Sequence, residues 1–187
     1  LRELSMGRFI LAIDQGTTGS TVALMDERGH IVGAVNFEFP QIYPKPGWVE
    51  HRPADIWRSV EKGIAAVFRK KLCKPTDIAA IGITNQRETS LLWDKCTGEP
   101  LNNAIVWQCR RTTGFCESLK SAGHENKIKR KSGLVLDPYF SASKFRWLLQ
   151  NTKGIAKLLK SDRVAAGTVD SFLISRLTGG AAHVTDV

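Results

Sequence analysis

Long hydrophobic runs and clustered cysteines are both missing from this sequence. No stretch approaches the roughly 18 consecutive apolar residues that cross a bilayer, and residues 1–5 lack the apolar core of a signal peptide. The four cysteines form no C-x-x-C pair and are too sparse for a disulfide-stapled secreted domain. We therefore expect a soluble, cytoplasmic protein without a membrane span.

Two common nucleotide-binding motifs are also absent. Neither G-x-G-x-x-G nor G-x-x-x-x-G-K-[ST] occurs, which excludes the Rossmann and Walker phosphate loops. The four histidines share no spacing, so the sequence indicates neither a metal cage nor a pair of nucleophile and base.

The charge balance is basic. Lysine and arginine number 27 against 18 acidic residues, a net charge of +9, and two basic runs stand out, Arg69–Lys74 and Lys127–Lys131. Neither run is interleaved with aromatic residues, so we interpret both as solvated helix ends and expect no nucleic-acid partner. A basic surface also suits a protein that binds a polyanionic small molecule.

The first half of the chain alternates between strand and helix patterns. Residues 9–13, 21–25 and 31–39 predict three antiparallel strands, and the proline-rich segment Pro40–Pro53 predicts an exposed, irregular connection. A helix with one apolar stripe begins at Pro53, and Ile78–Ile83 predicts a buried strand.

The second half predicts short strands at 90–93 and 105–107 and helices at 108–120, 141–150 and 168–178, with Thr168 able to cap the last. At 187 residues, one compact unit is the simplest expectation. The sequence thus predicts an α/β fold with a mixed sheet that opens with a three-strand antiparallel meander and is flanked by helices.

A polar loop, Asp14–Ser20, follows the first strand. Glycine lets backbone N–H groups approach phosphate oxygens, hydroxyls add donors, and an aspartate at a strand end can hold Mg²⁺. Phosphoryl transfer needs this positioning and charge neutralisation. An ordinary hairpin turn rich in glycine and threonine is the alternative.

Three further features could bind a polyol. Arg87 and Glu88 follow a predicted strand, and one guanidinium with one carboxylate satisfies a hydroxyl as donor and acceptor. Trp107 and Tyr139 could cover a carbon skeleton, the phenol adding a polar group. A surface ion pair for the first two residues, and core positions for the two aromatic residues, are the alternatives.

Taken together, these segments resemble the glycerol kinases of the FGGY family of carbohydrate kinases. The matching stretches are DQGTT (14–18), YPKPGWVE (43–50), IGITNQRET (81–89), AIVWQCRR (104–111), GLVLDPYFS (133–141), GTVD (167–170) and HVTD (183–186). Their order and spacing run through nearly the whole chain from Phe9.

The resemblance implies a ribonuclease-H-like, actin-like ATPase fold that transfers the γ-phosphoryl group of ATP to glycerol. It assigns ATP and Mg²⁺ to the first loop, through Asp14, Gly16, Thr17, Thr18 and Ser20, with Asp14 holding Mg²⁺ through water. It assigns glycerol to Arg87, Glu88, Trp107 and Tyr139. A homo-oligomer of the full-length protein stays open.

Two departures from the family pattern matter. Thr21 stands where the family usually has an arginine in the phosphate loop, and one lost phosphate contact costs about 1.5 to 3 kcal/mol. The family's general-base aspartate and second domain would follow Val187. We therefore expect residues 1–5 to be upstream or added residues, residues 6–187 to be a first domain incomplete at its C-terminal end, and the isolated chain to be inactive.

Three alternatives remain. The threonine at position 21 leaves open a noncatalytic protein that binds polyol or nucleotide, and the resemblance leaves open another small polyol as substrate. A ribonuclease-H-like nuclease would need several carboxylates on two metals, and beside Asp14 the only other acid at a strand end is Glu88, next to Arg87.

Overall fold

The computed structural model describes residues 8–186, which form two compact units. Unit 1 takes residues 8–40 and 54–86, and unit 2 takes residues 41–53 and 87–186. The predicted upstream segment, residues 1–5, lies outside the described residues. Each unit has its own four-stranded sheet.

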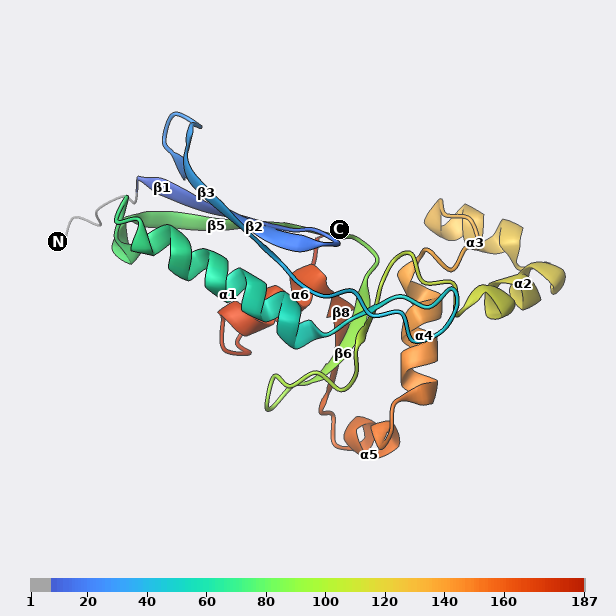
Figure 1. The fold of residues 1–187 in the computed structure, drawn as a ribbon. Coiled ribbons are helices and arrows are strands. Elements are labelled where there is room, and N and C mark those ends of the chain that lie inside the picture. The colour runs from blue at the N-terminus through green and yellow to red at the C-terminus, as the bar shows by residue number, and fades with distance from the viewer. Residues whose placement is uncertain (1–7, 187) are drawn as a thin grey trace. The chain divides into compact units, whose positions relative to one another are not determined.

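Unit 1 is a mixed sheet with a helix along one face (Figure 1). Its elements are β1 (Phe9–Gln15), β2 (Gly19–Asp26), β3 (Ile31–Glu38), α1 (Pro53–Arg69), the 3₁₀ helix η1 (Pro75–Asp77) and β5 (Ile78–Asn85). The strand order is β3-β2-β1-β5, antiparallel except for the parallel pair β1 and β5. This order confirms the predicted meander within a mixed sheet.

Alternation along the strands decides which face of this sheet is covered. Leu11, Ile13, Val22 and Leu24 are buried, whereas their neighbours along each strand are more exposed. The apolar stripe of α1 covers these residues, and Gly63 lets it come close, because a Cβ there would lie 2.4 Å from Val22 Cγ2. The core of unit 1 therefore lies between α1 and one face of the sheet.

The burial predicted for β5 is wrong. Residues 79–82 are exposed, and Ile81 keeps 47% of its accessible surface. Within the described residues β5 pairs with β1 alone, so it is an edge strand despite its apolar composition.

Unit 2 holds the second sheet and five helices. Its elements are β4 (Glu50–His51), β6 (Ser90–Asp94), β7 (Ala104–Ile105), α2 (Thr113–Ser121), α3 (Glu125–Ser132), α4 (Ser141–Asn151), α5 (Ile155–Lys160), β8 (Val164–Thr168) and α6 (Val169–Leu177). The strand order is β4-β7-β6-β8, with antiparallel pairs throughout.

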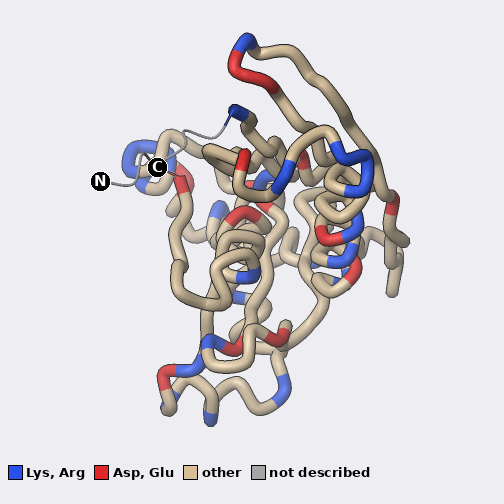
Figure 2. Tube along the Cα trace, turned by 90° about the vertical axis from the view of Figure 1, so that its left-hand side faces the viewer, with Lys and Arg blue, Asp and Glu red and all other residues tan. Residues whose placement is uncertain are grey.

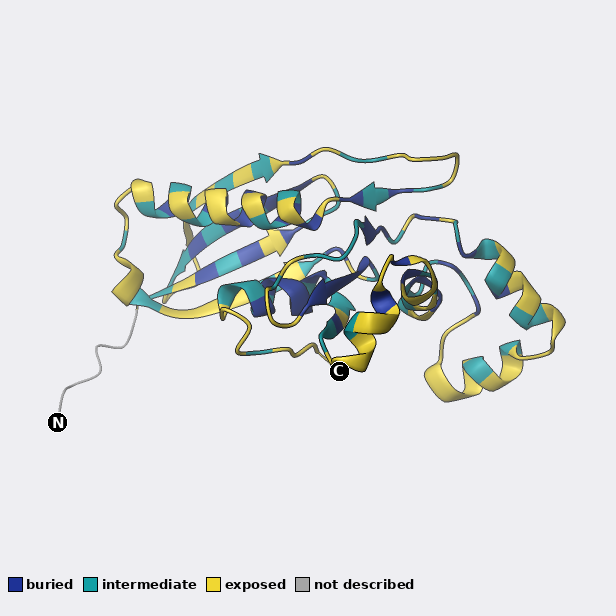
Figure 3. Cartoon of the chain, turned by 90° about the horizontal axis from the view of Figure 1, so that it is seen from below, coloured by how far each residue is buried: buried dark blue, intermediate teal, exposed yellow. Residues whose placement is uncertain are grey.

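Strand β6 is the centre of unit 2, and all five of its residues are buried (Figure 3). Leu92 packs in a core cluster with Leu148 of α4, while Trp93 meets Phe172 of α6 edge to face at 5.6 Å. Cys109 belongs to the same core cluster as Leu92. Helices thus cover both faces of β6, which is why it reads as a continuous apolar run.

Three local predictions need correction. The proline-rich connection contains β4, whose His51 is fully buried. Thr168 stands at the N-cap of α6, but its hydroxyl donates to the Asp170 carboxylate rather than capping the backbone.

The third correction concerns the helix predicted from residue 108, which begins only at Thr113. The Arg111 guanidinium lies over the rings of Trp48 and Trp147, at 3.9 and 4.6 Å from their centroids. It also donates to Glu50 Oε1 at 2.7 Å. These tertiary contacts hold residues 108–112 in turns, against their helical pattern.

Candidate functional site

Candidate site residues lie in both units, and the first group surrounds the turn between β1 and β2. Gly16 N–H donates to Gly19 O at 2.8 Å, and Phe39 N–H donates to Thr18 O at 3.2 Å. A Cβ at Gly19 would lie 2.8 Å from the carbonyl oxygen of Phe37, so only glycine fits there. The loop is a tight turn fastened to the end of β3.

Two buried glutamines hold this turn from the side of β5. Gln86 Nε2 donates to Gln15 Oε1 at 3.1 Å and to Gly16 O at 3.2 Å, while Gln15 Nε2 donates to the same carbonyl at 2.7 Å. Gln86 N–H also donates to Gln15 O at 2.7 Å. Since Arg87 follows directly, the peptide that leaves unit 1 at Gln86 is fixed to the phosphate-loop candidate.

A row of polar residues crosses the exposed face of the same sheet. Asp14 pairs across the ladders with Thr84 of β5 on one side and with Thr21 of β2 on the other, and Thr21 pairs with Asn36 of β3. Directly paired residues present side chains on one face. Asn36 Nδ2 donates to Thr21 Oγ1 at 2.9 Å. The Asp14 carboxylate is exposed and makes no side-chain hydrogen bond within the described residues.

The predicted nucleotide residues thus have different surroundings. Asp14 and Thr18 are exposed at the turn. The N–H of Gly16 is already used within the turn, and the Ser20 hydroxyl is buried against α1, 2.7 Å from Ser59 Oγ. Ser20 therefore serves the packing of β2 on α1, and we leave it out of the site. Thr17 is half-buried in the same turn.

Glu88 is the best-anchored residue of the second group, which lies in unit 2. Its Oε2 accepts from both the N–H and the hydroxyl of Ser141, at 2.7 and 2.6 Å, at the first turn of α4. Its Oε1 accepts no hydrogen bond from any described residue. The backbone of Glu88 has φ 66°, in the left-handed region that is costly for residues other than glycine.

Trp107 and Tyr139 lie against one another, edge to face, with their ring centroids 5.9 Å apart. Trp107 N–H donates to the buried hydroxyl of Thr89 at 3.3 Å, and Thr89 follows Glu88. Tyr139 stands two residues before Ser141, which binds the Glu88 carboxylate. The structure thus brings Glu88, Trp107 and Tyr139 together, and both aromatic residues are half-buried, with Trp107 packed against the core cluster of unit 2.

Arg87 is exposed, and its guanidinium has no partner among residues 8–186. The predicted ion pair between adjacent side chains, the alternative for Arg87 and Glu88, is therefore not formed. The Arg87 cation and one carboxylate oxygen of Glu88 therefore remain available for hydrogen bonds, which suits a small molecule with several hydroxyl groups.

Sequence reasoning missed Gln86, Ser141 and Lys144. Gln86 directly precedes Arg87 and Ser141 lies two residues after Tyr139, so closeness to a predicted site residue could have found these two. Lys144, five residues after Tyr139, carried no such signal. Lys144 of α4 is fully buried, and its ammonium donates to the carbonyl oxygens of Pro138 and Tyr139. Desolvation lowers the pKa of Lys144 to about 8, against an opposing effect of the Glu88 carboxylate.

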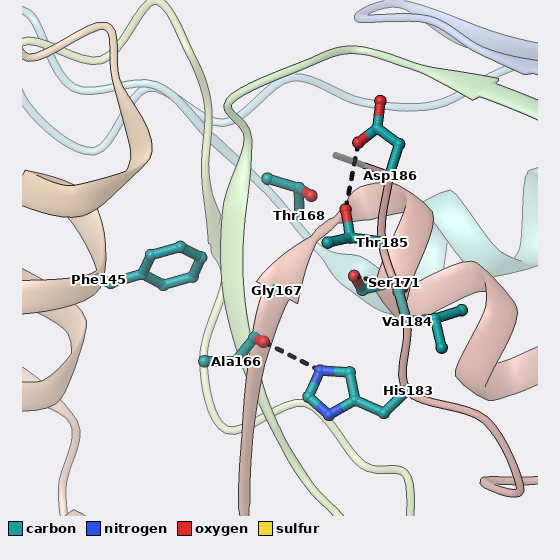
Figure 4. Close-up of a pocket in the computed structure, with 9 residues that line it drawn as sticks. All are labelled: Phe145, Ala166, Gly167, Thr168, Ser171, His183, Val184, Thr185 and Asp186. Atoms are coloured by element: carbon teal, nitrogen blue, oxygen red, sulfur yellow. Dashed lines mark hydrogen bonds between the residues drawn. The ribbon is translucent and has the colours of Figure 1, made fainter. Parts of the chain in front are cut away.

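A separate hollow of about 430 Å³ lies beside β8 and α6 in unit 2 (Figure 4). Its polar groups already have partners: Thr185 Oγ1 donates to Asp170 at 2.7 Å, His183 Nε2 lies 3.1 Å from Ala166 O, and Ser171 Oγ donates to Val184 O at 2.9 Å. None of the predicted site residues lines it. These bonds fasten residues 183–186 to unit 2.

The first basic run begins at the end of α1, as predicted, whereas the second makes up most of the short helix α3 (Figure 2). Arg69 is in the last turn of α1 and Lys127–Lys131 belongs to α3, where every basic residue is exposed. Within residues 8–186, no three histidine, cysteine, aspartate or glutamate side chains gather as metal ligands. No described helix is both long and apolar enough to cross a membrane.

Comparison with known proteins shows which family the chain matches and how much of its relatives' length it covers. A family profile described as the N-terminal domain of the FGGY family of carbohydrate kinases matches residues 9–187. The chain is 54% identical over 179 residues to a glycerol kinase of Halothermothrix orenii, covering 96% of this chain and 36% of that protein. It is 55% identical over 181 residues to a glycerol kinase of Marinomonas sp., covering 97% and 37%.

A crystal structure of Plasmodium falciparum glycerol kinase with ADP superimposes with a TM-score of 0.78 at 35% identity. It covers 92% of this chain and 34% of that one. The chain therefore spans little more than a third of the length of these relatives, and it shares their actin-like ATPase fold. The chain belongs to the FGGY family of carbohydrate kinases.

Proposed function

We propose that this chain is the N-terminal part of a glycerol kinase, which phosphorylates glycerol with ATP to give glycerol 3-phosphate. Unit 2 would bind glycerol, and unit 1 would bind the phosphates of ATP. The observation that carries the proposal is Glu88, whose Oε2 is fixed to α4 while its Oε1 accepts no hydrogen bond from the described residues; the preceding residue, Arg87, is exposed and unpaired among them. The relatives support it, because both curated proteins named above are glycerol kinases.

The polyol chemistry follows from these groups. A glycerol hydroxyl would donate a hydrogen bond to Glu88 Oε1 and accept one from the Arg87 guanidinium, so this pair of residues would satisfy the hydroxyl both as donor and as acceptor. Trp107 and Tyr139 would cover the C–H face of the three-carbon chain. Because Ser141 fixes Glu88, the acceptor is held in one orientation, which supplies part of the rate enhancement of a two-substrate reaction.

The phosphate side rests on Asp14 and the turn after β1. The exposed, unpaired Asp14 carboxylate, flanked by hydroxyls of Thr84 and Thr21, fits a hydrated Mg²⁺ ion better than a structural ion pair. Bound Mg²⁺ would neutralise phosphate charge during transfer. Thr17, Thr18 and the Gly16 turn would lie along the phosphates, with Gln15 and Gln86 holding the turn in place.

We assign the general base to the part of the protein that follows this chain. Arg87 and Glu88 bind and orient glycerol in this proposal, and the transfer is in line, from the γ-phosphoryl group to the aligned hydroxyl. The remaining length of the relatives would supply the base, the cover for adenine and the exclusion of water. A homo-oligomer and a cytoplasmic location belong to the same proposal.

A noncatalytic binding protein is the second candidate, and Thr21 is the observation that favours it. The position holds no cation, and its hydroxyl accepts from Asn36 instead. The side-chain amide of Asn36 would contribute less to phosphate binding than an arginine guanidinium would, because the amide donor carries no charge. Under this candidate the fold binds polyol or nucleotide without transfer.

The test is glycerol-dependent ADP release by the complete kinase, given ATP and Mg²⁺ with glycerol, xylulose, gluconate or no acceptor. We expect release with glycerol alone. Arg87→Ala should lower kcat/KM for glycerol by roughly ten- to a hundredfold, the value of one charge-assisted hydrogen bond. Arg58→Ala, which removes an exposed arginine of α1, should leave kcat/KM unchanged.

The other outcomes separate the alternatives. Release with xylulose or gluconate instead would assign another acceptor to the same site. Glycerol binding by a folded protein without ADP release would support the noncatalytic candidate, and neither binding nor release would refute the proposed function.

A further inference from the structure

Lys144 is a fully buried lysine outside the predicted set of site residues. Its ammonium donates to the carbonyl oxygen of Pro138 at 3.0 Å and to that of Tyr139. It forms no ion pair or hydrogen bond with a carboxylate of the described residues. Backbone carbonyls alone are an expensive setting for a lysine, because burial disfavours the charged form.

The two carbonyls that Lys144 binds lie on either side of the Tyr139 α-carbon. Tyr139 N–H in turn donates to Asp137 Oδ1 at 2.8 Å, so both peptide groups of Tyr139 are held. Its ring packs edge to face on Trp107 and on Phe140, at 5.9 and 5.1 Å between centroids. The backbone position of Tyr139 is therefore determined by α4, from which Lys144 extends back over the preceding turn.

The same helix also fixes Glu88. Ser141, one turn before Lys144, donates twice to the Glu88 carboxylate. The start of α4 thus makes two separate contacts with the candidate site. Ser141 binds the carboxylate of Glu88, and Lys144 binds the backbone of the turn that carries Tyr139. An apolar residue in place of Lys144 would keep the helix but leave two carbonyl oxygens without their donor.

We propose that Lys144 is a positioning residue that holds Tyr139 against Trp107 and thereby sets the affinity for the polyol. The inference rests on the proposed function, because it treats Tyr139 as part of the glycerol site. Lys144 acts through Tyr139 and touches no substrate. Its effect should therefore appear in the KM for glycerol, should spare the KM for ATP, and should vanish when the Tyr139 ring is absent.

The experiment is a double-mutant cycle in the complete kinase, with Lys144→Met, Tyr139→Ala and the double variant. We expect Lys144→Met to raise the KM for glycerol roughly tenfold while the KM for ATP changes less than about twofold. In the Tyr139→Ala background the same substitution should change the KM for glycerol less than about twofold. Lys157→Met, at an exposed lysine of α5, is the matched control and should behave as wild type.

Two results would overturn the inference. Equal effects of Lys144→Met with and without the Tyr139 ring would show that the lysine does not act through Tyr139. A parallel rise in both KM values would show a general structural role. If Lys144→Met does not fold, Lys144→Gln keeps an uncharged N–H donor on a side chain that is one bond shorter, and its KM for glycerol should still rise alone.

Failure of the proposed function would look different. Wild-type enzyme is assayed first, and absence of glycerol-dependent ADP release there refutes the function itself. Normal wild-type turnover with an unchanged KM for glycerol in both Lys144 variants refutes only the positioning role.

Discussion

Replacing Glu88 by glycine should destabilise the protein less than replacing it by alanine, although glycine is usually the more destabilising of the two. Glu88 has φ 66°, and its carboxylate accepts two hydrogen bonds from Ser141. Both Glu88→Ala and Glu88→Gly remove those bonds and the charge at the start of α4. Only the alanine variant keeps a Cβ in the left-handed conformation.

The magnitudes follow from these contacts. Hydrogen bonds to a charged group contribute about 1.5 to 3 kcal/mol each, but Ser141 is half-buried and water can replace part of them, so we expect each variant to lose about 2 to 4 kcal/mol. The left-handed conformation costs a residue with a Cβ about 1 to 2 kcal/mol. Glycine costs about 0.4 to 1 kcal/mol through the unfolded state. Glu88→Gly should therefore be more stable than Glu88→Ala by roughly 1 kcal/mol.

Urea unfolding at fixed pH measures this difference, with the slope m compared to confirm that both variants unfold alike. Gly114→Ala is a useful reference, because a Cβ at Gly114 meets nothing within 4 Å and helical glycine to alanine should stabilise. Glu88→Ala equal to or more stable than Glu88→Gly would refute the backbone argument. Loss of less than 0.5 kcal/mol in both would refute the anchoring of Glu88 on α4.

Three other perturbations give separate tests. Burial lowers the pKa of His51 to about 4, so between pH 6.5 and 4 the unfolded chain binds more protons than the folded chain. The free energy of unfolding should therefore fall as pH falls through this range, by roughly 3 kcal/mol in total. His51→Gln should remove this part of the pH dependence measured by urea unfolding. Gly63→Ala should destabilise unit 1 by about 1 to 2 kcal/mol, since the new methyl overlaps Val22, and a raised Tm would contradict the packing of α1. The 187-residue chain by itself should release no ADP in response to glycerol, and a rate near that of the complete kinase would place the whole catalytic machinery within it.

Local sequence patterns were enough to predict the strands and helices whose form depends on residues close together in the chain. An apolar run at residues 9–13, a strand pattern at 21–25 and the alternation of residues 31–39 predicted the three strands of the meander. The apolar stripe after Pro53 gave α1, which begins at that residue. Polar groups at the ends of apolar runs gave Asp14, Arg87 and Glu88, since a strand end delivers side chains to the edge of its sheet.

Contacts between distant residues decided the rest. The apolar composition of β5 predicted burial, but residues 79–82 are exposed in an edge strand whose only partner among the described residues is β1. Arg111 delays the start of α2 because its guanidinium is held by Trp48, Trp147 and Glu50.

The same division runs through the candidate site. The sequence by itself determined which residues are able to hydrogen-bond a polyol, because charge and hydrogen-bonding capacity belong to the side chain. Only the tertiary structure decided that one oxygen of Glu88 is occupied by Ser141, 53 residues away, that the Ser20 hydroxyl is buried, and that Lys144 holds the Tyr139 turn. Availability of a polar atom depends on what the folded chain places beside it, and no local pattern encodes that.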